Sequence, residues 1–78
     1  SLVYKESDLR GRIGTVITAI PADGYGEVMI ESISGRIAKP ATSFDRVEIA
    51  NGTNVLVVDI KDGVLQVSSH QEIENYLF

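Results

Sequence analysis

The sequence is short, acidic and free of cysteine. Its 78 residues and 8.5 kDa suffice for one domain, which buries roughly 62% of the surface of the unfolded chain. Hydrophobic residues make up 44% and charged residues 23%, a balance that excludes a simple disordered chain. Without cysteine, and with one histidine, the chain offers neither a disulfide framework nor a thiolate metal site, and we expect no cofactor. The net charge of −4 argues against a surface that follows nucleic-acid phosphates.

No segment of the sequence is apolar enough to cross a membrane. The longest uninterrupted apolar stretch is Val55–Val58, whereas a membrane-spanning helix needs about 20 mostly apolar residues. A signal peptide also needs a longer apolar region than this. Because the chain starts with Ser1 rather than methionine, we expect it to be a soluble fragment of a longer protein.

β-branched residues dominate the sequence. Val, Ile and Thr account for 22 of the 78 residues, and their side chains favour strands over helices. Four residue pairs that end in glycine mark turns: Asp23-Gly24, Ser34-Gly35, Asn51-Gly52 and Asp62-Gly63. They follow one another at intervals of 11, 17 and 11 residues, which is typical of short strands with one inserted element.

Five strands fit between these turns. They are expected at Arg12–Ile20, Gly26–Ile33, Arg36–Ala41, Asn54–Lys61 and Val64–Ser69. The segment Thr42–Ala50, between the third and fourth strands, forms either a short helical turn or a small extra strand. Three strands, an insertion and two more strands are the order of an OB-fold, so we predict an all-β, five-stranded OB-fold-like barrel. Its hairpin turns are expected at Ser34-Gly35 and Asp62-Gly63.

Alternation of apolar residues predicts which face of each strand lines the barrel. Val16, Thr18 and Ile20 share a face of the first strand, and Val28 and Ile30 share a face of the second. The side chains predicted to be mostly buried are those of Val16, Ile20, Val28, Ile30, Ile37, Val55, Val57, Ile60, Leu65 and Val67.

The fourth strand interrupts this alternation. Val55 and Val57 have one parity, whereas Val58 and Ile60 have the other. A β-bulge near Val57–Val58 would reconcile the two pairs, because barrels use bulges to turn corners. The alternative is a strand that is buried on both faces.

Two short motifs have a possible functional meaning and a simpler structural one. Gly11-Arg12-Ile13-Gly14 matches the GxxG loop of KH domains, but it runs directly into a strand, where two glycines allow a bend and a close backbone approach. Lys39 and Ser43 have the residue types of a Ser–Lys dyad, but Pro40 is expected to break the strand between them.

The other ionisable residues do not suggest a reaction. Glu27 and Glu31 share a strand face with Met29 between them, which is typical of a solvated surface and also suits protein binding. His70 has no second histidine to act with. We therefore predict that the protein is not an enzyme and has no catalytic, cofactor-binding or metal-binding residues.

The expected binding surface of the barrel is poor in aromatic residues. An OB-fold binds through its second and third strands and through the loops that join strands one to two and four to five. Sites for single-stranded nucleic acid place aromatic and basic residues there. The first loop, Pro21–Gly26, has one aromatic residue, Tyr25, and the other, Lys61–Gly63, has none. Binding of nucleic acid or a small ligand is therefore the alternative function rather than the preferred one.

The order of glycines and aliphatic residues resembles that of a known family. Gly11-x-x-Gly14 is followed by Val16-x-Thr18-x-Ile20-Pro21, then by Ile49-x-x-Gly52-Thr53-x-Val55-x-Val57-Val58-x-Ile60 and Gly63-x-Leu65-x-Val67. This order, from about Leu2 to Ser69, resembles the C-terminal soluble domain of NfeD-like proteins, most closely the short YuaF-like type. The longer first loop, with Ala22 to Gly26, departs from the family's pattern.

The resemblance implies an OB-type barrel at the end of a bacterial membrane protein. Family members have several transmembrane helices before this domain and are typically encoded beside flotillin- or stomatin-like scaffold proteins. They are thought to organise membrane microdomains together with these scaffolds. On this basis we expect residues 1–9 to be a tether from a membrane segment, residues 10–70 the barrel and residues 71–78 a C-terminal tail, on the cytoplasmic side of the cell membrane.

The residues and the resemblance together predict a non-enzymatic protein-interaction domain. Its expected partner is a flotillin- or stomatin-like membrane scaffold rather than nucleic acid, and the fragment itself is expected to be monomeric. Aromatic residues, Met and Arg are enriched at interfaces, which gives four candidate contacts: Tyr25, Met29, Arg36 and Phe44. Each has a structural alternative, since Phe44 could cap the barrel, Tyr25 could pack over its own loop and Arg36 could pair with Glu27 or Glu31.

Overall fold

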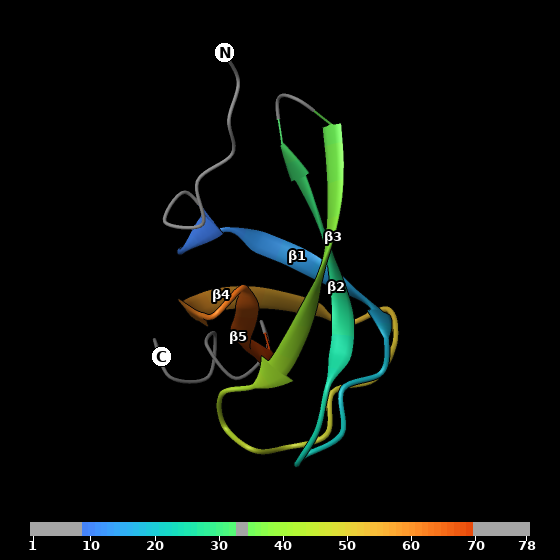
Figure 1. The fold of residues 1–78 in the computed structure, drawn as a ribbon. Coiled ribbons are helices and arrows are strands. Elements are labelled where there is room, and N and C mark those ends of the chain that lie inside the picture. Colours follow the sequence, from blue (N-terminus) through green and yellow to red (C-terminus); the bar gives the residue numbers. More distant parts are fainter. Residues whose placement is uncertain (1–8, 33–34, 70–78) are drawn as a thin grey trace, which may run out of the picture.

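Five strands close into a barrel in the computed structural model, which describes residues 9–32 and 35–69 (Figure 1). The strands are β1 (Ile13–Thr18), β2 (Gly26–Ser32), β3 (Gly35–Ser43), β4 (Asn54–Lys61) and β5 (Val64–Ser69). Their order around the barrel is β1-β2-β3-β5-β4, and β4 pairs back onto β1. Neighbouring strands are antiparallel except β3 and β5, which are parallel. This order confirms the predicted all-β barrel of the OB type.

β1 is shorter than predicted because its second half is irregular. Its pairing with β2 shifts register between Val16 and Thr18, so that Thr18 is exposed and donates a hydrogen bond from Oγ1 to Oε1 of Glu27 over 3.1 Å. Ile20 returns to the core and forms an isolated bridge with Ile49. The prediction that Thr18 shares the buried face was wrong, since Ile17, Thr18 and Ala19 are all exposed where the register shifts.

β3 is longer than predicted and runs through Pro40. It pairs with β2 from Gly35 to Ala41, but with β5 only from Ala41 to Ser43. Pro40 therefore lies where β3 has a strand on one side only, and there the missing N–H can face the open side. The expectation that Pro40 breaks the strand was wrong for this reason.

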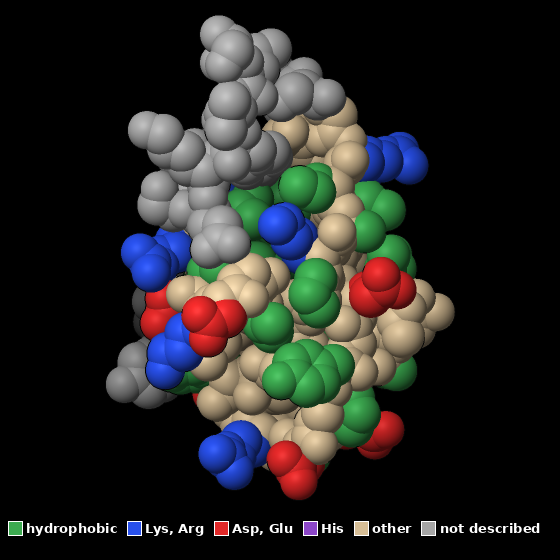
Figure 2. All heavy atoms as spheres, in the orientation of Figure 1, with side chains coloured by type: hydrophobic (Ala, Val, Ile, Leu, Met, Phe, Trp, Pro, Cys, Tyr) green, Lys and Arg blue, Asp and Glu red, His purple; other side chains and the backbone are tan. Residues whose placement is uncertain are grey.

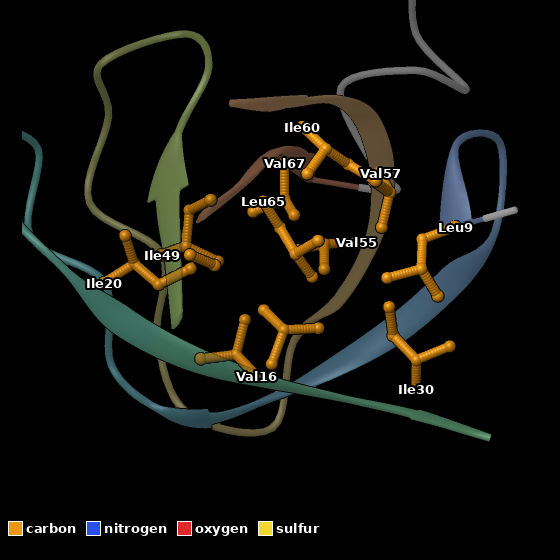
Figure 3. Close-up of a cluster of buried hydrophobic side chains, with 12 residues drawn as sticks. Leu9, Val16, Ile20, Ile30, Ile49, Val55, Val57, Ile60, Leu65 and Val67 are labelled. Carbon is orange, nitrogen blue, oxygen red and sulfur yellow. The ribbon is translucent and has the colours of Figure 1, made fainter. Parts of the chain in front are cut away.

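The segment between β3 and β4 closes one end of the barrel without a helix. The backbone N–H of Ile20 donates to the carbonyl of Ile49 over 2.9 Å, and the reverse bond is 2.8 Å long. Both side chains point into the core (Figure 3), and Ile49 is 2% exposed. Two alternatives were predicted for residues 42–50, a helical turn and a small extra strand. The structure is closer to the extra strand, although only a single bridge, between Ile20 and Ile49, is formed.

The inward-facing side chains of all five strands form one hydrophobic cluster (Figure 3). Nine of the ten side chains predicted to be buried are at most 8% exposed, and the tenth, that of Ile37, packs against the cluster partly buried. The cluster also contains Leu9, Ala41 and Ile49, which alternation alone did not identify. Leu9, at the end of the expected tether, is 1% exposed and packs in this cluster.

β4 contains the bulge that its parity suggested. Its pairing with β5 shifts register between Val57 and Asp59, which leaves Val58 as the extra residue. Val57 and Ile60 are buried, whereas Val58 is only half-buried. A bulge, rather than a strand buried on both faces, explains the change of parity.

Two glycines let β1, β2 and the loop between them approach closely. A Cβ atom on Gly14 would lie 2.6 Å from Cγ1 of Val28 and 2.9 Å from the carbonyl oxygen of Met29. A Cβ atom on Gly26 would lie 2.6 Å from the carbonyl oxygen of Ala19. Such contacts are too short for real atoms, so the close approach expected of the second glycine in the GxxG motif is confirmed at Gly14.

The hairpin predictions are confirmed where the structure describes them. Asp62 and Gly63 have φ angles of 52° and 78°, as in the type I′ turn that joins twisted antiparallel strands. Ser32 pairs with Gly35, so β2 and β3 form a hairpin, although Ser34 lies outside the described residues. Residues 1–8 of the expected tether, His70 and the expected tail at 71–78 also lie outside them. Within the described part of the chain, no helix is long and apolar enough to span a membrane.

Candidate functional site

A groove of about 400 Å³ lies where the loop between β1 and β2 meets the end of β3. The residues that line it include Asp23 and Tyr25 from that loop, Thr42, Phe44 and Arg46 from β3 and the segment after it, and Gln66 from β5. Its volume lies within the range of small-ligand sites, but its walls carry more polar groups than such sites usually do. A surface groove of this kind suits the side chains of a protein partner better than an enclosed small molecule.

Strand register brings two of the four candidate contacts to this groove. Tyr25 directly precedes β2 and Phe44 directly follows β3, and the pairing of Gly26 with Ala41 places these two strand ends side by side. The backbone N–H of Phe44 donates to the carbonyl of Val67 over 2.8 Å, which anchors the residue to β5. Tyr25 is 68% exposed and Phe44 is 51% exposed. Phe44 therefore does not cap the barrel.

The segment after β3 holds a charged residue in a strained conformation at the groove. Arg46 has a φ angle of 57°, which residues other than glycine seldom adopt and which is often found at functional sites. Two side-chain bonds hold its neighbours: Ser43 Oγ accepts from the N–H of Val47 over 3.0 Å, and Ser68 Oγ donates to Asp45. Within residues 9–32 and 35–69, Arg46 forms no salt bridge. No acidic side chain of this part of the chain occupies its guanidinium.

The other two candidate contacts lie away from the groove. Met29 is half-buried in the middle of β2, between Thr15 of β1 and Ala38 of β3. Arg36 lies opposite Glu31, and its Nε is 3.3 Å from Oε1 of that glutamate. This pair is roughly 20 Å along β2 from the groove. The structure thus separates the four candidates into a groove pair and two isolated residues, and it realises the alternative in which Arg36 pairs with Glu31.

The exposed hydrophobic surface is divided rather than continuous. In the space-filling view of one face, hydrophobic side chains form separate islands among charged and polar groups (Figure 2). The large exposed hydrophobic residues of the described chain are Ile13, Ile17, Tyr25, Phe44 and Val47. Scattered apolar residues of this kind are common on soluble proteins, so a binding site has to be argued from their neighbours as well.

Comparison with known families decides what kind of domain carries this groove. Residues 13–68 match the family model of the NfeD C-terminal domain. The chain belongs to the NfeD family. It is 62% identical over 73 residues to the "Membrane protein NfeD2" of Bacillus subtilis (strain 168), an alignment that covers 94% of this chain and 42% of that protein. The chain therefore spans less than half the length of this relative, and the resemblance inferred from its glycines and aliphatic residues is confirmed.

Two solved structures share the fold of this chain. The solution structure of the soluble domain of the NfeD protein YuaF from Bacillus subtilis is 62% identical, with a TM-score of 0.78 over 88% of this chain and 82% of that one. The C-terminal domain of stomatin operon partner protein 1510-C from Pyrococcus horikoshii has a TM-score of 0.73 at 24% identity, over 87% of this chain and 97% of that one. At that identity the likeness establishes the fold alone.

The structure separates the two residues considered for a Ser–Lys dyad in this NfeD domain. Lys39 and Ser43 both lie in β3, and four residues of extended strand span about 13 Å. Ser43 Oγ instead accepts a hydrogen bond from the backbone of Val47. Among the described residues, no group of three or more His, Cys, Asp or Glu side chains could hold a metal ion. The groove is therefore the feature on which a function can be argued.

Asp59 of the NfeD domain has a structural role. Its Oδ1 accepts hydrogen bonds from the backbone N–H of Ile60 over 2.8 Å and from Nε of Arg10 over 2.9 Å. The bond from Ile60, followed by that from Arg10, lowers the pKa of Asp59 below its ordinary value. Because Asp59 adjoins the bulge of β4, this carboxylate ties the residues before β1 to the bulge.

We expect Asp59 to contribute to stability at neutral pH and to lose that contribution in acid. Its folded-state pKa is depressed, so the contribution is fully present above the unfolded pKa of about 4 and is lost as the pH falls through the lower folded value. Urea unfolding between pH 7 and pH 2 should therefore show a weaker pH dependence in Asp59→Asn than in the wild type. In Arg10→Ala the hydrogen bond from Ile60 to Asp59 remains, so this variant should lose only part of the pH dependence of stability. Identical pH profiles for wild type and Asp59→Asn would contradict this role.

Proposed function

We propose that this NfeD domain is a non-enzymatic protein-interaction module that binds a flotillin- or stomatin-like membrane scaffold through the groove at Tyr25 and Phe44. The observation that carries the proposal is the pair of exposed aromatic side chains at one groove, beside Arg46, which forms no salt bridge with another described residue. Tyr and Arg are the residue types that most often dominate binding energy at protein interfaces.

The family supplies the setting of the proposal. The Bacillus relative is a membrane protein more than twice as long as the aligned segment, which leaves room for membrane segments in the whole protein. We propose that the domain is attached to such segments, lies on the cytoplasmic side of a bacterial cell membrane and is monomeric by itself. The name of the Pyrococcus protein refers to a stomatin operon, and it supports a scaffold of that class as the partner to be tested first.

Nucleic-acid binding is the alternative that the groove itself raises, because Tyr25 and Phe44 are residues on which bases can stack. Charge favours the protein partner. The chain has a net charge of −4, and Asp23 lies in the same groove as Arg46. A site for single strands needs a positively charged path for the phosphates. Titration with single-stranded oligonucleotides at low salt should therefore give no saturable binding.

The proposal is tested by co-purification of the whole membrane protein with the flotillin-like protein encoded in the same genome. In one variant the barrel is replaced by an unrelated soluble domain of similar size, which keeps the membrane part and the length of the protein. We expect the wild type to retain the scaffold in mild detergent and the replacement variant to lose it. Unchanged association in the replacement variant would assign the interaction to the membrane part and refute the proposal.

A further inference from the structure

Over residues 35–40, the side of β3 that faces away from β2 has no partner strand among residues 9–32 and 35–69. β2 pairs with β3 from Gly35 to Ala41, whereas β5 joins the other side only from Ala41 onward. No other strand of the described chain pairs with β3. In Figure 1 the upper part of the β2–β3 hairpin accordingly extends beyond the barrel as a two-stranded ribbon. Such an edge is a template for one more strand.

The direction of the free backbone groups follows from the pairing of β3 with β5. The N–H of Phe44 donates to Val67 of β5, and residues at alternate positions of a strand direct their N–H and C=O groups to the same side. The backbone polar groups that point to the β5 side are therefore those of Thr42, Pro40, Ala38 and Arg36. Pro40, which has no N–H, belongs to this set, as expected for proline at an open edge. Within the described chain no strand pairs with the N–H and C=O groups of Ala38 and Arg36 on this side, which leaves them open to a partner strand.

The charges beside this edge decide which strand fits. Arg36 and Lys39 place two positive charges within four residues of an otherwise acidic chain. The pair between Arg36 and Glu31 is about three-quarters exposed on both sides, so it exchanges readily with a competing carboxylate. A second copy of β3 would bring four positive charges into one ribbon, which disfavours self-pairing. An acidic strand from another protein would instead be attracted.

The order of side chains along β3 defines the partner further. Directly opposite residues in an antiparallel pair share a face, and Arg36 and Lys39 lie on opposite faces of β3 three positions apart. Ile37, between them, is half-buried and favours an apolar neighbour. We propose that the open edge of β3 binds an extended antiparallel segment of another protein with the order acidic, any residue, apolar, acidic. The inference rests on the proposed function only in treating the domain as a protein-binding module, because the edge is a second surface apart from the groove.

The probe for this edge is the peptide acetyl-TETVET-amide, titrated into the 78-residue chain while backbone amide resonances are followed by NMR. We expect the amides of Arg36 and Ala38 to shift in a saturable manner and to exchange more slowly with solvent, while those of Tyr25 and Phe44 stay unchanged. The matched peptide acetyl-TKTVKT-amide should cause no saturable shift. Absence of the shifts at Arg36 and Ala38, or equal shifts with both peptides, would overturn the proposal. Shifts that grow with protein concentration alone would assign the edge to a second copy and also overturn it.

Ala38→Pro is the decisive variant, because it removes a free N–H without touching the pairing with β2. We expect it to weaken peptide binding by about fivefold to tenfold, whereas Ala38→Ser, which keeps the N–H, should bind like the wild type. Arg36→Glu with Lys39→Glu should reverse the preference and select the lysine peptide, which keeps the test valid if Ala38→Pro fails to fold. Wild-type binding by Ala38→Pro, or an unchanged peptide preference after charge reversal, would refute the edge site. Substitutions at Tyr25 and Phe44 should leave peptide binding intact, so failure of the groove and failure of the edge are distinguishable.

Discussion

Replacing Leu65 by alanine is expected to destabilise the barrel by about 3–5 kcal/mol. Leu65 is fully buried, and it lies opposite Ile60 of β4 and Ala41 of β3, where the parallel strand pair closes the barrel. Neighbouring strands cannot collapse into the cavity without disturbing that closure. Since small domains are stable by about 5–15 kcal/mol, this loss is a large share of the total stability. Urea unfolding followed by circular dichroism measures the loss.

Leu56→Ala is the matched control for this prediction. Leu56 lies in β4 and is half-buried, because it faces outward opposite Ser68 and Ile13. Its truncation removes the same atoms from a position that is already partly in water, and should cost about 1 kcal/mol. Equal losses for the two leucines would contradict the assignment of inward and outward faces.

The second large effect concerns binding. Exchange of both Tyr25 and Phe44 for serine is expected to weaken scaffold binding at least about a hundredfold, because paired aromatic anchors commonly contribute 2 kcal/mol or more each. Stability should change little, since both side chains are more than half exposed. Ile13→Ser is a suitable control: Ile13 is 48% exposed on β1, and it is not among the residues that line the groove.

Most of the barrel could be predicted because the alternation of inward and outward side chains along a strand is visible in a short stretch of sequence. β2, β4 and β5 lie within a residue of their expected bounds, since alternating Val and Ile between glycine turns has few other solutions. The bulge in β4 was visible for the same reason, as Val57 and Ile60 differ in parity. The register shift in β1 could not be predicted in this way, because a threonine such as Thr18 suits either face of a strand. Leu9 is an isolated apolar residue and has no periodicity to reveal its burial.

Features that depend on how distant strands meet could not be predicted. Pro40 was expected to break the strand between Lys39 and Ser43, because its tolerance depends on an open edge that exists only once β5 has joined further along. Residue type alone pointed to Tyr25 and Phe44, but their common groove follows from the pairing of β2 with β3. Arg46 was missed, since no sequence signal marks an arginine with a positive φ angle.

The central claim, that this NfeD domain binds a scaffold protein through its aromatic groove, is tested most directly by calorimetric titration of the 78-residue chain with the purified soluble region of the flotillin-like protein. Wild type, the Tyr25→Ser/Phe44→Ser double variant and Ile13→Ser are compared at equal folded concentration, checked by circular dichroism. The account predicts saturable binding by the wild type and Ile13→Ser, and at least a hundredfold weaker binding by the double variant. Equal affinity of the double variant and the wild type, or no binding by the wild type, would contradict it.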